Sequence, residues 1–460
     1  MSPEASGRAA AGPARPGSDS WAERLLPGAW ALTGLFFGLT LAKWGNPAIL
    51  DHLNTPPEDF WQFVYFAWPL RWGYALLGLT VAVGLACWRW PGGVPIWLTG
   101  LPAGWFLWQC LAAAGTVDGA LTGLTLPYLL AGTVCYYHGL MLARHPRGAT
   151  WLWAGWLAGF LFMLAIGLQQ HFGGLEATRQ QILSRPDWQT LPPEFIERVN
   201  KLRVFATLMY PNSLAEALVL LLPAMTVAVW RLSGFLTRPT RLLLAGLVLA
   251  GGLGCLYWSK SKGGWLVALV LAGMVFWRMP MNRRWRLGIG VAVVAGGLAV
   301  FAVRFADYFR RGATSVGARF DYWRAACQVV ADHPVLGSGP GTFQREYARR
   351  KPPEAEMTRL VHNDYLQQAS DSGLPGAVLY AALVWGSLAW LARRCWREPM
   401  RFAVWLGLAG WALQSFIEFG LYIPPIGWGA FYLLGWLTRE AAGDSTGFSA
   451  PHFQQAGRSA

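Results

Sequence analysis

The chain has 460 residues, of which 54% are hydrophobic and only 13% charged, and it carries a net charge of +14. Soluble domains carry about 25% charged residues. The composition therefore excludes a string of soluble domains and predicts an all-α, polytopic membrane protein. In such a protein an excess of positive charge reflects the orientation of the loops, so we expect no nucleic-acid partner.

The first segment, residues 1–24, is rich in Ala, Pro, Gly and Ser and is expected to be a disordered tail. A membrane-spanning helix needs roughly 20 mainly apolar residues, and about twelve segments of the remaining chain have this character. The expected spans are about 25–43, 66–88, 94–114, 121–142, 150–168, 208–230, 241–258, 263–280, 286–304, 373–392, 402–418 and 421–438. Residues 439–460 form a second expected tail.

The short connections fix an orientation. Four of them are basic and are expected on the cytoplasmic side: "ARHPRG" (143–148), "RLSGFLTRPTR" (231–241), "RMPMNRRWR" (278–286) and "RRCWREPMR" (393–401). The short outer connection "GTVD" (115–118) has no positive charge. This is the positive-inside pattern, and an even number of spans leaves both tails in the cytoplasm.

Two outer segments are long, at about 169–207 and 305–372. Loops longer than about 15 residues are usually functional or disordered. The second contains Phe320, Trp323, Cys327 and Val330 at helical spacing, which predicts an amphipathic helix lying on the outer membrane surface. The chain is thus expected to carry nine spans at 25–304, a large outer loop at 305–372 and three spans at 373–438.

Both outer loops are rich in arginine, whose planar fork suits phosphate groups. Most of these side chains are expected to be solvated. Arg203 and Arg319 differ, because each stands at a membrane boundary beside apolar sequence, where an arginine needs an anionic partner. An anionic lipid headgroup, such as a polyprenyl pyrophosphate, would satisfy that need.

His362 stands just before an outer-face span and could act as a general base, since the unperturbed pKa of histidine lies near 6.5. If it lies on a helix, it shares a face with Tyr365 and Leu366. The alternative is an ordinary interfacial histidine. We expect no metal, because the spacing of Asp332, His333 and His362 matches no ligand pattern.

The glycine-rich segment "LGSGPGTF" (336–343) lacks the Gly-Lys-Ser/Thr of a nucleotide-binding loop. We expect a tight turn that redirects the loop towards the membrane. No cofactor is expected.

Four blocks resemble, in the same order, the O-antigen ligase and O-antigen polymerase superfamily of membrane glycosyltransferases. They are "RVFATLMYPNSLAEALVLLLPA" (203–224), "SKSKGGWLVALV" (259–270), "RFDYWRAACQVVADHPVLGSGPGTF" (319–343) and "HNDYLQQASDSGLPG" (362–376). The last is the most specific. Two positions depart from the pattern: Lys262 stands where arginine is usual, and Asp371 where glutamate is usual.

The resemblance implies that His362 activates an acceptor hydroxyl while Arg203 and Arg319 hold a lipid pyrophosphate. It also implies substrate contacts from a second set of residues, namely Asn212, Lys262, Arg324, Asn363 and Tyr365. The implied enzyme is a metal-independent, inverting glycosyltransferase of the bacterial inner membrane. Its donor would be a glycan on undecaprenyl pyrophosphate, its surroundings membrane lipid, and its active site on the periplasmic face.

Three acceptors remain open. The lipid A core would make the protein an O-antigen ligase and is ranked first. Another lipid-linked glycan would make it an O-antigen or exopolysaccharide polymerase, and a protein side chain would make it an O-oligosaccharyltransferase. A transporter is the alternative from another class, with Arg71 and Glu418 as the charges nearest the middle of a span.

Overall fold

A computed structural model describes residues 21–145, 147–310 and 314–443. These residues are 78% helical and contain no β-strand, which confirms the all-α class. Most of each expected tail lies outside the described residues: the first helix begins at Trp21 and the last ends at Ala442.

The α-helices of the described chain are α1 (Trp21–Lys43), α2 (Phe60–Tyr65), α3 (Leu70–Leu85), α4 (Ile96–Ala112), α5 (Gly119–Met141), α6 (Gly148–Gln169), α7 (Leu175–Leu183), α8 (Pro193–Asn200), α9 (Pro211–Leu232), α10 (Arg238–Trp258), α11 (Lys262–Arg278), α12 (Arg283–Arg310), α13 (Thr314–Asp332), α14 (Phe343–Arg350), α15 (Asp364–Ala381), α16 (Ser387–Cys395), α17 (Pro399–Gln414) and α18 (Pro424–Ala442). Single π-helical turns join α6 to α7 and α15 to α16.

Seven helical segments of the described chain are long and apolar enough to cross a membrane. They are Trp21–Lys43, Gly119–Met141, Gly148–Leu183, Pro211–Leu232, Arg238–Trp258, Arg283–Ala306 and Asp364–Cys395. The other expected spans also contain helices, among them α3 and α11, but at 16 and 17 residues these are short. At 1.5 Å per residue such helices cover only about 25 Å. The number of about twelve spans therefore stays a prediction.

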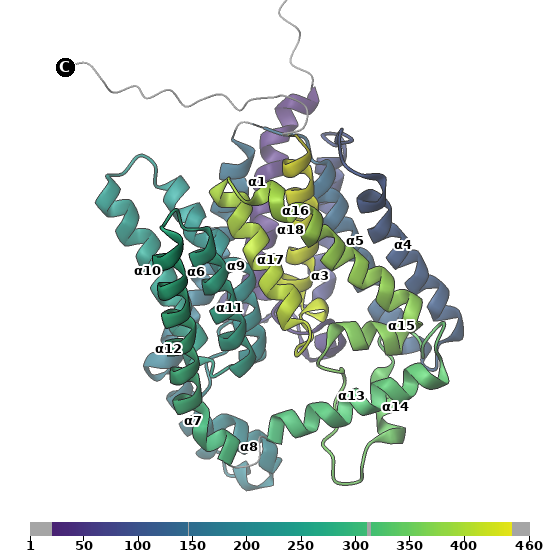
Figure 1. Cartoon of the computed structure of the whole chain (residues 1–460). Helices are drawn as coiled ribbons and strands as arrows, with labels where there is room; N and C mark the ends of the chain where they lie inside the picture. The colour runs from purple at the N-terminus through teal and green to yellow at the C-terminus, as the bar shows by residue number, and fades with distance from the viewer. Residues whose placement is uncertain (1–20, 146, 311–313, 444–460) are drawn as a thin grey trace, which may run out of the picture.

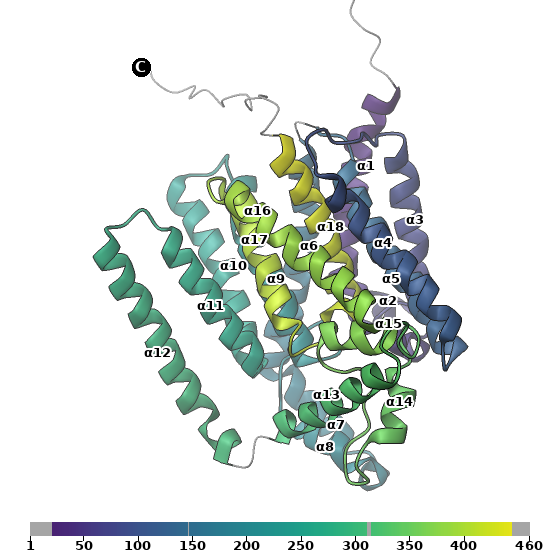
Figure 2. The ribbon, with the colours of Figure 1, turned by 45° about the vertical axis from the view of Figure 1, so that its right-hand side comes forward.

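The helices form one bundle around α9, α17 and α18 (Figure 1). Almost every residue of α18 is buried, because α1, α5, α9, α16 and α17 all pack against it. By contrast, α12 packs mainly on α11 and lies at the edge of the bundle (Figure 2). Its side chains are mostly exposed, as expected for a helix that faces lipid.

Small residues allow a close contact between α1 and α6. Gly34 and Gly38 of α1 face Gly155 and Gly159 of α6, and a Cβ atom built on Gly38 would lie 2.3 Å from the Gly155 carbonyl oxygen. Lipid tails are as apolar as leucine, so membrane helices associate through close packing of this kind rather than through the hydrophobic effect. The two small-xxx-small pairs therefore hold α1 against α6.

The outer layer is helical, as expected. In Figure 1 the helices α7, α8, α13 and α14 lie at the end of the bundle opposite to the first turn of α1 and the last turn of α18. The expected amphipathic helix is α13. Its inner face is formed by Tyr322, Ala325, Ala326 and Val329, whereas Phe320 and Cys327 remain exposed, as suits a helix between protein and membrane surface.

The arrangement predicts the result of a topology experiment. The basic α11–α12 connection lies at the end that carries the described termini, and α14 lies at the other end (Figure 2). A reporter fused after residue 282 should therefore read cytoplasmic, and one fused near residue 350 should read periplasmic, in a dual alkaline phosphatase and β-galactosidase assay. Both fusions reading on the same side would contradict the orientation.

Candidate active site

A buried carboxylate organises the outer end of the bundle. Glu418 lies in the turn after α17 and is 4% exposed. Its Oε1 atom accepts hydrogen bonds from Arg319 Nη2 of α13 at 2.6 Å and from Asn212 Nδ2 of α9 at 2.7 Å. Its Oε2 atom lies 3.5 Å from His362 Nδ1. One side chain thus connects four segments that are far apart in the sequence.

Arg203 joins this group through Asn212. Its Nη2 atom donates to Asn212 Oδ1 at 2.7 Å, and its Nε atom donates to the Ser259 carbonyl at 2.8 Å. Arg319 is fixed from its other side by a hydrogen bond from Nε to the Ile417 carbonyl at 3.1 Å. Both guanidinium groups are therefore held by more than one partner, which fixes their direction before any ligand binds.

The charges of the cluster do not cancel. Burial would raise the pKa of Glu418, but the charges of Arg319, His362 and Arg203 bring it below its usual value. Burial lowers the pKa of Arg203 to about 10, although the charge of Glu418 acts in the opposite direction. Two guanidinium groups therefore share one carboxylate. An arginine pair with this surplus of positive charge can hold an anion such as a phosphate.

His362 is not on a helix, so the expected face shared with Tyr365 and Leu366 is wrong. The helix α15 begins at Asp364, and Asn363 is its N-cap, with Oδ1 accepting from the Leu366 amide at 3.0 Å. The His362 backbone has φ +56°. The N-cap must be extended to begin the helix, and His362 stands in the sharp turn that precedes it.

Aromatic rings fix the plane of the His362 imidazole. It stacks on Tyr322 with ring centroids 5.7 Å apart and meets Phe419 edge to face at 4.7 Å. With Nδ1 directed to Glu418, no described protein group hydrogen-bonds Nε2. The side chain is 26% exposed, so Nε2 can receive a proton from a bound hydroxyl.

Backbone strain is concentrated at this site. The described non-glycine residues with positive φ are Leu202, Ala206, Lys260 and His362. They flank Arg203, precede Lys262 or carry the imidazole itself. Such conformations cost roughly 1–3 kcal/mol each and cluster at functional sites. Their grouping here is an observation, independent of side-chain chemistry, that points to the same place.

The other expected substrate contacts lie at different distances from the cluster. Lys262 begins α11. Burial lowers its pKa, and together with the nearby charges of Arg203 and Arg319 it brings this pKa to about 8. Tyr365 donates to the Ala412 carbonyl at 2.9 Å and packs on Phe416, so it braces α15 against α17. Arg324 is exposed and lies 3.4 Å from Asp321, away from Glu418.

The glycine-rich segment forms the expected turn and locks the outer loop onto α15. The helix is interrupted at Ser372 and Gly373, which frees the carbonyls of Ser370 and Asp371 to accept the amides of Ser338 and Gly339, each at 2.9 Å. The Asp371 carboxylate accepts the Gly341 amide at 2.9 Å. Asp371 therefore has a structural role, because its carboxylate holds the glycine-rich turn against α15.

Glu418 is the residue that sequence reasoning missed as a site residue. The sequence presents it only as one of the charges nearest the middle of an expected span. The available signal is a lone carboxylate within the apolar stretch 402–438, because a charge there requires a cationic partner. Arg203 and Arg319, which stand at expected membrane boundaries, need the opposite, namely an anionic partner.

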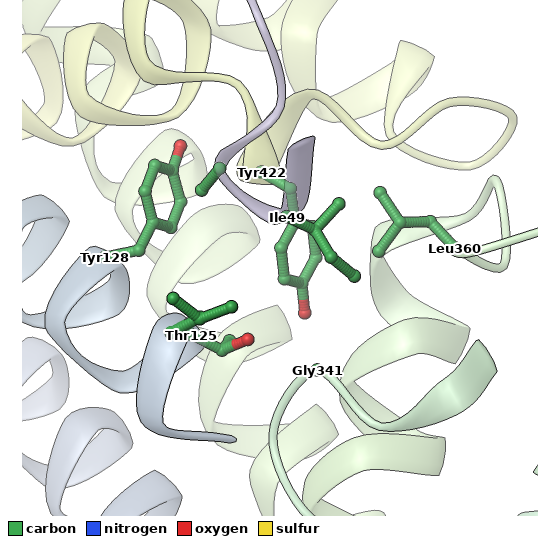
Figure 3. A pocket seen from close by; sticks show the side chains of 8 residues that line it. Ile49, Thr125, Tyr128, Gly341, Leu360 and Tyr422 are labelled. Carbon is green, nitrogen blue, oxygen red and sulfur yellow. The ribbon is translucent and has the colours of Figure 1, made fainter. Parts of the chain in front are cut away.

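The described residues offer neither a metal site nor, in the pocket beside Leu360, a site for a phosphate. Within the described residues no group of three His, Cys, Asp or Glu side chains could hold a metal ion. A narrow pocket lies beside Leu360, lined by Ile49, Thr125, Gly341 and Tyr422 among others (Figure 3). Its lining is mainly apolar and includes no cationic side chain, so it is unsuited to a phosphate.

One comparison with known proteins found a match. Residues 245–381 match the family model described as O-Antigen ligase. The match begins within α10 and runs through α11, α12, α13 and α14 to the end of α15, so it contains Lys262, Arg319 and His362. It supports membership of the O-antigen ligase superfamily. The comparison with curated proteins found no match.

The Arg319–Glu418 pair should be strongly coupled. Removing one partner leaves a buried charge unpaired, which typically costs 3–5 kcal/mol. We expect Arg319→Ala and Glu418→Ala each to lower the thermal unfolding midpoint in detergent, and the double variant to lose clearly less than the sum. The exposed pair Arg185 and Asp187 is the matched control and should give an additive cycle. Additivity at 319 and 418 would contradict the cluster.

Proposed function

We propose that this protein of the O-antigen ligase superfamily is an O-antigen ligase acting on the periplasmic face of the bacterial inner membrane. It would transfer a glycan from undecaprenyl pyrophosphate to a hydroxyl group of the lipid A core. The observation that carries the proposal is the meeting of Arg203, Arg319 and His362 around Glu418. Three separate sequence blocks supply these side chains, and they converge at the outer end of the bundle.

The bond changes are those of a direct displacement. The acceptor oxygen attacks the anomeric carbon of the donor, and the bond from that carbon to the pyrophosphate oxygen breaks. The electron pair leaves on the pyrophosphate, and the acceptor proton passes to His362 Nε2. Attack opposite the leaving group inverts the anomeric centre.

The arginines supply the charge that the leaving group requires. Arg319 and Arg203 are held rigidly by Glu418, Asn212 and backbone carbonyls. Preorganised donors of this kind stabilise a developing negative charge, with typical contributions of about 3–4 kcal/mol per donor. Since guanidinium groups can take this part, the proposed reaction does not call for a metal ion.

Glu418 orients the base. It lies beside Nδ1 of His362, so it favours the tautomer with the proton on Nδ1 and leaves Nε2 free to accept. Once Nε2 is protonated, the same carboxylate stabilises the imidazolium. The acceptor hydroxyl must then lie on the Nε2 side of the ring, and the pyrophosphate on the side of the arginines.

The alternative of a transporter rested on two charged residues, and their positions argue against it. Arg71 is the second residue of α3 and is exposed, and Glu418 lies beyond the last residue of α17 and is paired with Arg319. Both stand at helix ends. Transport sites lie near the middle of the bilayer, between broken helices, whereas this charge cluster lies at the outer end.

His362→Gln separates the catalytic role from packing. Glutamine keeps a polar side chain but cannot hold a proton near neutral pH. We expect glycan transfer to fall roughly 100-fold or more, while binding of the lipid-linked donor survives because the arginines remain. The assay uses purified protein, undecaprenyl pyrophosphate-linked glycan and lipid A core, with and without chelator.

Three results would contradict this account. A fully active glutamine variant would remove His362 from the chemistry. Inhibition by the chelator would contradict a charge supply from arginine alone. A protein that extends lipid-linked glycan but leaves lipid A core unmodified would be a polymerase rather than a ligase.

Arg319→Lys tests the guanidinium fork. Lysine keeps the charge but cannot reach Glu418 and the Ile417 carbonyl together as Arg319 does. We expect most transfer activity to be lost in Arg319→Lys and nearly all in Arg319→Ala. Arg345→Ala is the control, because this outer-loop side chain is 64% exposed and bonds to Asp118. Equal losses at 345 and 319 would show that the overall loop charge matters and not a placed fork.

A further inference from the structure

Three cations stand beside the proposed site and have no part in the chemistry described above. Lys260 lies in the turn between α10 and α11, Lys262 begins α11, and Arg304 lies in the outer part of α12. They come from neighbouring elements that meet next to Arg203. We call Lys260 and Arg304 the outer cation pair.

Lys260 is held in place by its backbone. It has φ +52°, and its Nζ atom donates to the Lys201 carbonyl at 2.8 Å. The turn that carries it is tied to the Arg203 segment, because the Val204 amide donates to the Trp258 carbonyl at 3.2 Å. Arg203 also bonds to Ser259. The positions of Lys260 and Arg203 are therefore fixed relative to each other.

Arg304 approaches the same turn from α12. Its guanidinium carbon lies 5.4 Å from the centroid of the Tyr257 ring. The next residue, Phe305, lies under the Lys262 ammonium at 5.5 Å. These contacts place the outer part of α12 against the α10–α11 turn, so that Arg304 and Lys260 lie near each other.

The outer cation pair, Lys260 and Arg304, has little internal compensation. Burial lowers the pKa of Lys260, and the charges of Arg304 and Arg203 lower it further. Among the ion pairs of the described residues, none joins a carboxylate to Lys260 or Arg304. Like charges held together at a membrane boundary are costly, so an external anion is the natural partner.

We propose that the outer cation pair forms a second phosphate subsite, which binds the phosphate nearer the lipid and so selects a diphosphate carrier over a monophosphate one. This inference rests on the proposed function. Arg203 and Arg319 would hold the phosphate attached to the sugar, and Lys260 and Arg304 the one attached to the prenyl chain. The lipid-facing α12 at the edge of the bundle (Figure 2) leaves the prenyl chain in contact with the membrane.

The test compares two prenyl probes with the full-length protein in nanodiscs of neutral phosphatidylcholine. Binding of farnesyl diphosphate and of farnesyl monophosphate is measured for the wild type and for Lys260→Gln/Arg304→Gln. We expect the wild type to prefer the diphosphate, and the double variant to lose roughly tenfold or more in diphosphate affinity. Its monophosphate affinity should change little, because Arg203 and Arg319 remain.

Matched variants separate position from charge. The control Arg179→Gln/Arg185→Gln removes two positive charges from the other outer loop, where each side chain is paired with a carboxylate of that loop, and should keep the preference. The variant Lys260→Arg/Arg304→Lys keeps both positive charges. We therefore expect it to keep most of the diphosphate preference that Lys260→Gln/Arg304→Gln loses.

Two results would overturn the inference in distinguishable ways. If the glutamine variant keeps the diphosphate preference while Arg203→Gln weakens both probes, the second subsite is wrong and the proposed donor class stands. If the wild type binds neither probe, or binds both no better than added phosphatidylglycerol, the proposed donor class fails and the subsite fails with it.

Discussion

The whole outer end of the bundle depends on one buried carboxylate. Transfer of an unpaired ion into a protein interior costs several kcal/mol even after relaxation, so Arg203, Arg319 and Glu418 cannot be buried singly. Together they are compatible with burial, because Glu418 and Asn212 satisfy both guanidinium groups. The start of α9, the surface helix α13 and the turn before α18 are consequently fixed relative to one another.

The same arrangement leaves more positive than negative charge in the cluster. Glu418 compensates one positive charge, while two arginines and a partly exposed histidine face it. The cluster is thus held together by its own contacts but still carries surplus positive charge at the outer end of the bundle. In the proposed reaction a lipid diphosphate would supply the missing negative charge, and this would link the fold to that reaction. The strained turns at Leu202, Lys260 and His362 hold the relevant side chains in the directions that this requires.

Sequence reasoning located most of the cluster and misjudged its geometry. Arg203 and Arg319 stood out because arginine beside apolar sequence needs an anion, and His362 because of its place before a span. The helical face assigned to His362 was wrong, since an N-cap asparagine at 363 begins the helix one residue later. Periodicity carries no information about a single residue in a turn.

Glu418 shows a different limit. Its partners lie 99 and 206 positions away along the chain, and pairings over such distances follow from tertiary packing, not from local pattern. The length and apolar character of the segments predicted a helical membrane protein correctly. They did not predict that Asn363 and Tyr365, which belong to the most specific motif, use their polar atoms to cap and brace α15.

The most direct test of the central claim is the position of a bound lipid diphosphate. Cryo-electron microscopy of the protein with undecaprenyl pyrophosphate should show phosphate density within hydrogen-bonding distance of Arg203 and Arg319, on the side of Glu418 that faces His362. Density for the diphosphate elsewhere, for example in the apolar pocket beside Leu360, would contradict the account.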